Sequence, residues 1–486
     1  MSGDILILLT LAIPAAGAIL IMLAGAVPNL RETVTLATAG LLAIAVYSIV
    51  PMVFAGEPPA TGALEVVPGL DIAFAVEPLG MLFACVASTL WIVNSIYSIG
   101  YMRGNEEPRQ TSFYVCFAVA IAATMGIAFS ANLFTLFLFY EVLTLSTYPL
   151  VTHKGTDEAR RGGRIYLTML IGSSTLLLLP AIVWTGFLAG TLDFAPGGIL
   201  GERAEPVVIG VLLALYAFGI GKAALMPLHF WLPSAMVAPT PVSALLHAVA
   251  VVKAGVFTVL KVVVYVFGID LLTATAVNEW LIYVAAASVL IGSLVAMTKD
   301  NLKARLAYST VSQLAYIVLG AALADPMGIL GGGLHIATHA VGKITLFFCA
   351  GAIYTAAHKT EISELDGLGR AMPFTFAAFF IGACSIIGLP PLAGLWSKWY
   401  LALGAYDSGH LAIIAVLMVS SLLNIAYLLP IPLRAFFGTP KKEVPAGIRE
   451  APLPILIAIG VTSLGCFVLF FYPGPIVEML GTIPLR

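Results

Sequence analysis

The feature that most constrains this chain is a succession of apolar segments, each long enough to cross a bilayer. A transmembrane helix needs about 20 predominantly apolar residues, and roughly fourteen such segments can be counted. Of the 486 residues, 60% are hydrophobic and 10% are charged, whereas soluble domains carry about 25% charged residues. The sequence therefore predicts an all-α integral membrane protein with about fourteen transmembrane helices.

The expected helices are the apolar segments between short polar connections. They cover residues 4–24, 33–55, 76–100, 111–129, 131–152, 161–189, 205–229, 240–267, 277–298, 302–323, 327–357, 372–402, 410–436 and 452–472. Basic residues are segregated between the two sets of connections. Of the 23 Lys and Arg residues, 16 fall at connections after odd-numbered helices. Because basic loops stay in the cytoplasm, both termini are expected outside.

Two of these helices are interrupted by prolines. The first interruption contains Pro227, Pro233 and Pro239, and the second contains Pro390 and Pro391. Broken backbone at membrane depth is tolerated where protein or a water-filled cavity satisfies it, and paired discontinuous helices are typical of transporters with inverted repeats.

The two breaks lie in expected helices seven and twelve, which are five helices apart. We therefore expect two inverted five-helix repeats. The expected organisation is N-terminal helices over 1–110, a first repeat over 111–267, an inverted second repeat over 277–436 and a C-terminal helix within 452–486.

Several ionisable residues fall within the expected spans, where charge is costly and usually functional. The lysines are Lys222, Lys253, Lys261, Lys343 and Lys398. Glu141 is the one clear intramembrane carboxylate, and the histidines within spans are His247, His335 and His339. A buried amine releases its proton more readily than an exposed one, and a nearby carboxylate opposes the release. We therefore predict a proton path, with Glu141 and Lys222 as its switch pair.

Helical spacing refines this hypothesis. His335, His339 and Lys343 recur every four residues and are expected on one helix face. His247 and Lys253 are six residues apart and should face opposite sides unless the helix is distorted. Structural roles are the alternatives: a helix–helix hydrogen bond for His247, and for Lys261, near a helix end, a side chain extended to the membrane surface.

Other classes of function find little support. The net charge of -2 offers no attraction to nucleic acid, and the five cysteines form no CxxC pair. We expect no metal or cofactor, and therefore no electron transfer by this chain alone.

Five segments make the chain resemble a known family. They are FYEVLTLSTYPL, GKAALMPLHFWLPSAMVAPTPVSALLHAVAVVKAG, NLKARLAYSTVSQLAYI, HIATHAVGKITLFFCAG and GLPPLAGLWSKWYL, within residues 75–430. The chain resembles the antiporter-like subunits shared by respiratory complex I, Mrp cation/proton antiporters and membrane-bound hydrogenases. The resemblance implies a fourteen-helix fold with a proton path along a central polar axis.

The resemblance also assigns residues to that path. They are Glu141, Lys222, His247, Lys253, Lys303, His335, His339, Lys343 and Lys398. Lys303 is assigned to the path only by the resemblance, because the distribution of charge leaves it at the cytoplasmic end of a helix. Lys398 is closer to the D-type Mrp subunit and the L-type complex I subunit than to the M-type, which usually has Glu there. The chain ends soon after the last helix, whereas the L-type continues into a long lateral helix.

We therefore expect the D-type subunit of an Mrp Na+/H+ antiporter in a prokaryotic inner (plasma) membrane, surrounded by lipid and by other membrane subunits. A proton-pumping subunit of a complex I-like NADH:quinone oxidoreductase or of a membrane-bound hydrogenase is the first alternative. A structural membrane scaffold, whose ion pairs hold helices together, is the second.

Overall fold

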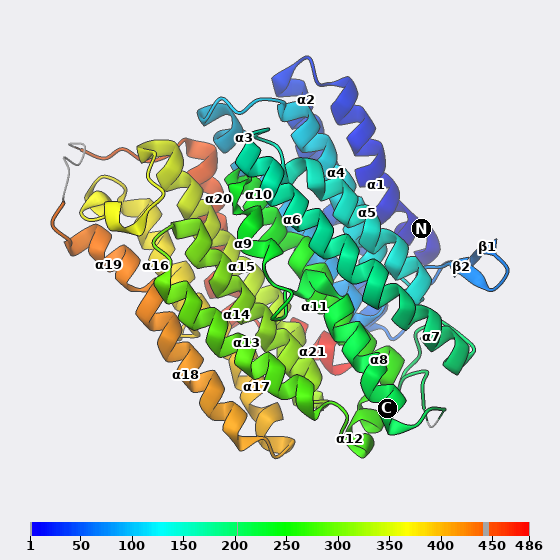
Figure 1. The fold of residues 1–486 in the computed structure, drawn as a ribbon. Helices are drawn as coiled ribbons and strands as arrows, with labels where there is room; N and C mark the ends of the chain where they lie inside the picture. The colour runs from blue at the N-terminus through cyan, green and yellow to red at the C-terminus, as the bar shows by residue number, and fades with distance from the viewer. Residues whose placement is uncertain (1, 202, 441–446, 486) are drawn as a thin grey trace.

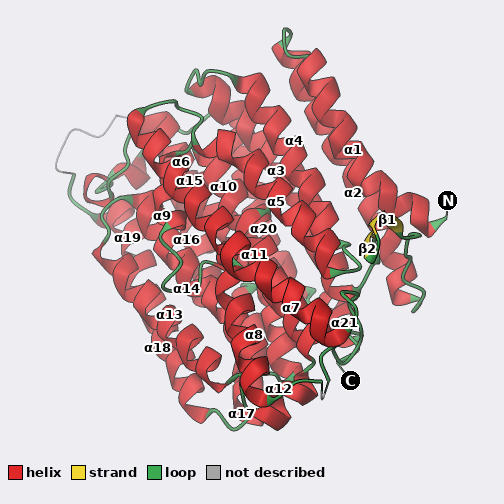
Figure 2. Ribbon diagram, turned by 45° about the vertical axis from the view of Figure 1, so that its right-hand side comes forward, coloured by secondary structure: helices red, strands yellow, loops and turns green. Residues whose placement is uncertain are grey.

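The computed structural model describes residues 2–201, 203–440 and 447–485, apart from the side chain of His247. The chain forms one bundle of long, roughly parallel and antiparallel helices (Figure 1). Loops and short turns gather at the two ends of the bundle (Figure 2). This is the arrangement that a polytopic membrane protein requires, because helices satisfy their own backbone hydrogen bonds in lipid.

Among the described residues, ten helices are long and apolar enough to cross a membrane. Eight of them are single helices: α1 (Gly3–Leu23), α2 (Pro28–Phe54), α3 (Pro78–Gly104), α4 (Gln110–Ala128), α5 (Leu133–Val151), α13 (Glu279–Thr298), α15 (Pro326–Ala357) and α20 (Leu453–Phe471). The other two are built from consecutive pieces: α6 (Asp157–Ser173) with η1 (Ser174–Leu178) and α7 (Leu179–Ala189), and α18 (Leu411–Leu428) with α19 (Pro430–Phe437).

The remaining four expected spans are shorter, broken or more polar. They correspond to α8 (Pro206–Gly219), to α10 (Thr240–Ala244) with η4 (Leu245–Val249), α11 (Val251–Val262) and η5 (Val263–Phe267), to α14 (Leu302–Ala322), and to α16 (Pro373–Ile387) with α17 (Gly394–Asp407). Every expected span therefore has a helical counterpart among the described residues. The inverted relation between the two five-helix units stays a prediction.

Both predicted interruptions are present, but the first begins earlier than expected. Helix α8 ends at Gly219, ten residues before the expected end at residue 229. The chain then passes through short turns, η2 (Gly221–Ala223), α9 (Trp231–Ser234) and η3 (Ala235–Val237), before α10 begins. The second interruption separates Ile387 from Gly394. Proline cannot donate a backbone hydrogen bond, so the helix direction is lost where prolines cluster.

Helix α15 is the core of the bundle. Its 32 residues begin at Pro326, and the N-cap carboxylate of Asp325 accepts hydrogen bonds from the N–H groups of Met327 (2.8 Å) and Gly328 (3.2 Å). Of its most apolar stretch, 94% is buried. A Cβ atom at Gly331 would lie 2.7 Å from the backbone of Leu401 in α17. Small residues thus allow α15 to approach its neighbours closely.

Smaller elements close the ends of the bundle. Strands β1 (Leu64–Val67) and β2 (Leu70–Ile72) form an antiparallel hairpin between α2 and α3. Short helices α12 (Ile269–Thr275) and α21 (Gly474–Gly481) and the turns η6 (Ile362–Glu364) and η7 (Leu368–Arg370) complete the described elements. The two chain ends lie on the same side of the bundle (Figure 1), which we call the terminal face.

Candidate functional site

The first helix break holds Lys222 inside the bundle. Lys222 lies in the turn η2, and the indole of Trp231 donates a hydrogen bond of 2.9 Å to the carbonyl oxygen of Gly221. Gly255 in α11 packs directly on this turn, because a Cβ there would lie 2.3 Å from the carbonyl carbon of Lys222. Trp231 thus satisfies a backbone carbonyl of the break, and α11 packs against its backbone at Gly255.

The Lys222 amine is completely buried and bonded to uncharged oxygens. Its Nζ donates hydrogen bonds to the carbonyl of Tyr140 (2.8 Å) and to the hydroxyl of Thr144 (2.6 Å), both in α5. It also lies 3.1 Å from the centre of the Tyr140 ring. Helix α5 therefore supplies both the oxygens and the aromatic face that accommodate this amine.

The predicted switch pair, Glu141 and Lys222, does not form an ion pair in this structure. Among the described ion pairs, none joins them within 4.0 Å, although the Glu141 charge still acts electrostatically on Lys222. Both Glu141 carboxylate oxygens are buried and lack a hydrogen-bond partner among the described residues. Tyr140 and Thr144, which flank Glu141 in α5, take the hydrogen bonds of the Lys222 amine instead.

The second break holds Lys398 in a similar way. Its Nζ donates hydrogen bonds to the carbonyl of Ile387 (2.8 Å), the last residue of α16, and to the hydroxyl of Ser421 (3.1 Å) in α18. The ring of Tyr316 lies 5.1 Å from the amine. A helix C-terminus attracts positive charge because its last carbonyls have no intrahelical partners.

Helix α15 links α11 with the second break through two stacked histidines. The Lys253 Nζ and His339 Nδ1 lie 2.7 Å apart. The rings of His339 and His335 stack with centroids 5.6 Å apart, as their four-residue spacing predicts. His335 Nδ1 lies 2.8 Å from the hydroxyl of Ser397, next to Lys398 in the chain. The described structure thus brings Lys253, His339, His335 and Lys398 into one region.

Lys343 is buried one turn farther along α15. Its Nζ donates a hydrogen bond of 2.7 Å to the hydroxyl of Ser309 in α14, and the Tyr427 hydroxyl donates one of 3.0 Å to the same oxygen. The three predicted residues of α15 therefore lie on one side of the helix. Lys343, however, bonds to α14 rather than to the histidines.

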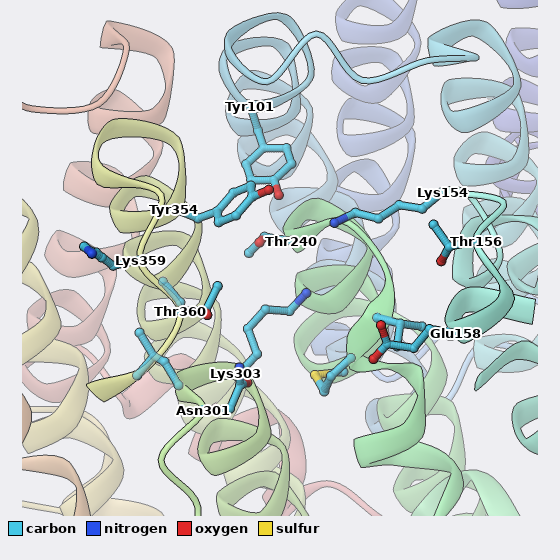
Figure 3. A pocket seen from close by; sticks show the side chains of 14 residues that line it. Tyr101, Lys154, Thr156, Glu158, Thr240, Asn301, Lys303, Tyr354, Lys359 and Thr360 are labelled. Atoms are coloured by element: carbon cyan, nitrogen blue, oxygen red, sulfur yellow. The ribbon is translucent and has the colours of Figure 1, made fainter. Parts of the chain in front are cut away.

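Lys303 lies at the end of the bundle opposite the terminal face. Its Nζ donates a hydrogen bond of 2.5 Å to the carbonyl of Ala238 in the first break. It also lines a cavity of about 320 Å³ in which the side chains of Lys303 and Lys154 point toward one another (Figure 3). The polar residues around this cavity include Tyr101, Lys154, Thr156, Glu158, Thr240, Asn301, Lys303, Tyr354, Lys359 and Thr360. The cavity is lined both by loop residues such as Thr156 and by Met236 and Val237 of the first helix break.

Glu107 carries a negative charge near the same cavity. Burial raises the pKa of Glu107 above its ordinary value, while the charges of Lys154 and Lys303 act in the opposite direction. This carboxyl lies in the loop between α3 and α4, outside the spans. It is therefore a third ionisable group acting on the two lysines.

Two further predictions meet different outcomes. The interpretation of Lys261 as a side chain extended to the membrane surface is wrong, because the residue is fully buried and forms an ion pair with Glu77. His247 lies in the π-helical segment η4, and its side chain is outside the described part of the structure. The helix distortion that would change the orientation of His247 relative to Lys253 is present, because η4 is π-helical whereas Lys253 lies in the α-helix α11.

The structure adds residues that sequence reasoning missed. Tyr140 and Thr144 bind Lys222, Ser397 binds His335, and Tyr316 stacks on His335 with ring centroids 5.5 Å apart. All four lie in the conspicuous motifs, one to three positions from a predicted ionisable residue or on the facing helix. Uncharged hydroxyls give no hydropathy signal, which is why a search for charges passes over them.

These features define a class. The fold is a multi-pass helical bundle, and its interior holds amines and imidazoles beside two broken helices. Within the described ranges, no group of three or more His, Cys, Asp or Glu side chains is arranged to hold a metal ion. The arrangement suits transfer of protons between neighbouring groups, since both amines and imidazoles can bind and release them.

The comparisons define the family. Residues 130–424, more than half of the chain, match the family model described as "NADH:quinone oxidoreductase/Mrp antiporter, TM". The chain belongs to this family and is an antiporter-like, proton-translocating membrane subunit of the kind found in Mrp and complex I-like assemblies.

Individual relatives cover the chain to different extents. NADH-quinone oxidoreductase subunit N of Desulforudis audaxviator is 31% identical, over 98% of this chain and 96% of the relative. NAD(P)H-quinone oxidoreductase chain 5 of Synechocystis sp. is 31% identical over 68% of this chain, which spans about half (49%) of that longer protein. A chain in the structure of the Mrp complex from Dietzia sp. DQ12-45-1b matches with a TM-score of 0.88 and 24% identity, over 99% of this chain and 97% of that one.

Proposed function

We propose that this chain carries protons across the membrane through a buried Glu/Lys/His relay, as the D-type subunit of an Mrp-type Na+/H+ antiporter. The observation that carries the proposal is the contact series Lys253–His339–His335–Ser397, which runs between two broken helices. Each ionisable member is buried and each is close to the next. A purely structural helix contact would not need four titratable or hydroxyl groups in succession.

In this relay, an amine gains or loses its proton when a neighbouring charged group moves toward it or away from it. With Glu141 withdrawn, Lys222 is held by a carbonyl and a hydroxyl, which bind a neutral amine as well as a charged one. When Glu141 approaches, its charge favours the protonated amine; when it withdraws, the proton passes on. His247, Lys253, His335 and His339 relay it, and Lys343 and Lys398 are the sites in the second repeat.

The cavity beside Lys303 is the mouth of this path at the end opposite the terminal face. It is lined by lysines, hydroxyls and a carboxylate, and polar cavities of this size hold water. The Lys303 amine spans from the cavity to the backbone of the first break. The distribution of basic connections supports a cytoplasmic mouth, with both termini outside a prokaryotic plasma membrane.

A redox-coupled role is the second candidate function. The relative named subunit N of an NADH-quinone oxidoreductase aligns with almost the whole of this chain, at 31% identity. In that role the same relay would be driven by electron transfer in separate subunits. The two candidates differ in partners and energy source, while the proton path within this chain is common to both.

Purification in mild detergent followed by flux measurements tests both candidates. We expect small membrane antiporter subunits to co-purify, and a Na+ gradient across reconstituted vesicles to drive proton flux that Lys222→Ala or Glu141→Ala abolishes. Co-purified iron–sulfur or flavin subunits, with flux driven by NADH, would replace the antiporter with the redox candidate. Unchanged flux in both variants, with normal assembly, would support the scaffold instead.

A further inference from the structure

A second buried polar cluster lies near the terminal face, and the relay proposed above does not use it. Its centre is Lys261, which is fully buried at the end of α11. The Lys261 amine forms an ion pair with Glu77 and donates a hydrogen bond of 2.6 Å to the carbonyl of Ser130. The ring of Phe194 lies 4.5 Å from the amine. The amine is therefore enclosed by one acid, one carbonyl and aromatic carbon.

Glu77 is turned inward although its backbone position favours another role. It is the N-cap residue of α3, yet its side chain makes no capping hydrogen bond. Short polar side chains at this position, Ser, Thr, Asp or Asn, usually bind the first free N–H groups of a helix. Here the carboxylate is directed to Lys261, and its second oxygen, Oε2, is buried without a hydrogen-bond partner among the described residues. The side chain as a whole keeps 15% of its surface exposed.

A cavity of about 380 Å³ opens beside this carboxylate. It is lined by Glu77, Ser130 and Tyr265 together with loop residues such as Pro58 and Thr482. Tyr265 is 4% exposed, faces Glu77, and its hydroxyl has no well-oriented hydrogen bond among the described groups. Buried polar atoms are almost always satisfied by protein or water. The Tyr265 hydroxyl and the Glu77 carboxylate lie near enough to interact with each other, and the partly exposed Glu77 side chain lines the cavity, so water in the cavity can reach this pair.

Lys261 also lies in register with the relay. It follows Lys253 by eight residues on the same helix, which corresponds to roughly 12 Å along the axis and about 80° around it, so both lie on the same side of α11. Phe257 lies midway between them, with its ring 5.5 Å from the Lys261 amine and 5.0 Å from the ring of Phe83. The two amines are thus aligned but separated by an aromatic side chain.

We propose that Glu77, Lys261 and Tyr265 form a proton gate between Lys253 and the terminal face, a proposal that rests on the proposed proton relay. In the gating step the Lys261 ammonium gives its proton to the Glu77 carboxylate, leaving a neutral amine and a carboxylic acid. The acid then releases the proton to water in the cavity, where the Tyr265 hydroxyl hydrogen-bonds to it. A proton arriving from Lys253, once the ring of Phe257 turns aside, restores the ammonium.

The groups that set the pH response of the gate come from three elements. Helix α3 contributes Glu77, and α11 with η5 contributes Lys261 and Tyr265. Ser130 and Phe194, from the loops before α5 and before α8, are uncharged neighbours. A permanent ion pair would hold the same groups without exchanging protons, so the test must separate assembly from transport.

The test uses the intact complex in vesicles, with proton flux measured while the pH on the terminal face is varied. We expect Glu77→Gln to lower flux at least ten-fold and to flatten its dependence on that pH, and Tyr265→Phe to lower flux several-fold. The double variant Glu77→Leu with Lys261→Met removes both charges together, so it should assemble normally and remain inactive. Asp193→Asn, an exposed acid in a loop near the same face, should transport like the wild type.

Wild-type flux in the assembled double variant would overturn the gate and leave the pair as a structural contact. Wild-type flux and pH dependence in Glu77→Gln would do the same. Lys222→Ala, measured in parallel, separates this failure from failure of the relay. If Lys222→Ala is inactive while the Glu77 variants transport normally, the gate is wrong and the relay stands. If Lys222→Ala transports normally, the relay itself is wrong.

Discussion

The buried amines of the proposed relay are bonded mainly to uncharged groups. Lys222, Lys343 and Lys398 each contact a hydroxyl, and Lys253 contacts an imidazole. A carbonyl or hydroxyl oxygen accepts a hydrogen bond from either form of an amine, so loss of the proton leaves no uncompensated charge. A permanent carboxylate partner would instead hold the proton in place. Lys261 is the exception, since it contacts Glu77.

A titratable residue outside the spans gives a pH prediction. Burial, and next the charge of Arg109, lowers the pKa of His153 to about 4 from 6.5. The unfolded chain therefore binds a proton between pH 6.5 and 4 that the folded chain does not, so stability is full above pH 6.5 and falls across this window. At about 1.4 kcal/mol per pKa unit, the loss is on the order of 1–3 kcal/mol.

Thermal unfolding of the purified complex at pH 7.5 and pH 4.5 measures this effect. His153→Gln should reduce the drop in midpoint between the two values, whereas His358→Gln, at an exposed position, should leave it unchanged. An identical drop in the wild type and in His153→Gln would show that His153 contributes nothing to the acid sensitivity.

At the scale of elements, the two helix breaks were predictable and their interiors were not. Proline clusters and apolar length located both breaks and predicted a helical segment in each of the fourteen expected ranges, ten of which hold helices long and apolar enough to span among the described residues. The early end of α8 at Gly219 was missed, because residues 220–226 are apolar apart from Lys222 and contain no proline. What ends the helix is tertiary: Trp231 and α11 satisfy and pack the turn around Lys222.

The close packing of α11 on this turn yields an element-scale prediction. A methyl group at Gly255 would meet the Lys222 carbonyl carbon and the Ala223 nitrogen, both at 2.3 Å. These are backbone atoms and cannot rotate away, so Gly255→Ala should displace the break. Overpacking of this kind costs about 1–3 kcal/mol. We expect a lower unfolding midpoint and loss of proton flux.

Gly172→Ala in α6 is the matched control, since a Cβ there has no neighbour within 4 Å. It should leave midpoint and flux close to wild type. A Gly255→Ala complex with wild-type stability and flux would mean that the break tolerates movement and that the geometry around Lys222 is not critical.

At the scale of the whole molecule, the ionisable groups run in a band from one end of the bundle to the other. Lys303 lies at the cavity opposite the terminal face, and Glu77 lies at the cavity near it. Between them α15 carries its histidines through the centre of the fold. The sequence identified most members of this band as charges in apolar helices, but it could not show which of them touch, since contacts such as that between Lys253 and His339 join residues 86 positions apart.

The central claim, that these buried amines carry protons, is tested most directly by Lys253→Met in the assembled complex. Methionine fills similar volume without a charge, and replacing buried ionic groups by apolar ones is often neutral or stabilising. We therefore predict normal assembly, an unchanged or higher unfolding midpoint, and proton flux reduced at least a hundred-fold, while Arg160→Gln at the exposed start of α6 transports normally. Wild-type flux through an assembled Lys253→Met complex would contradict the claim.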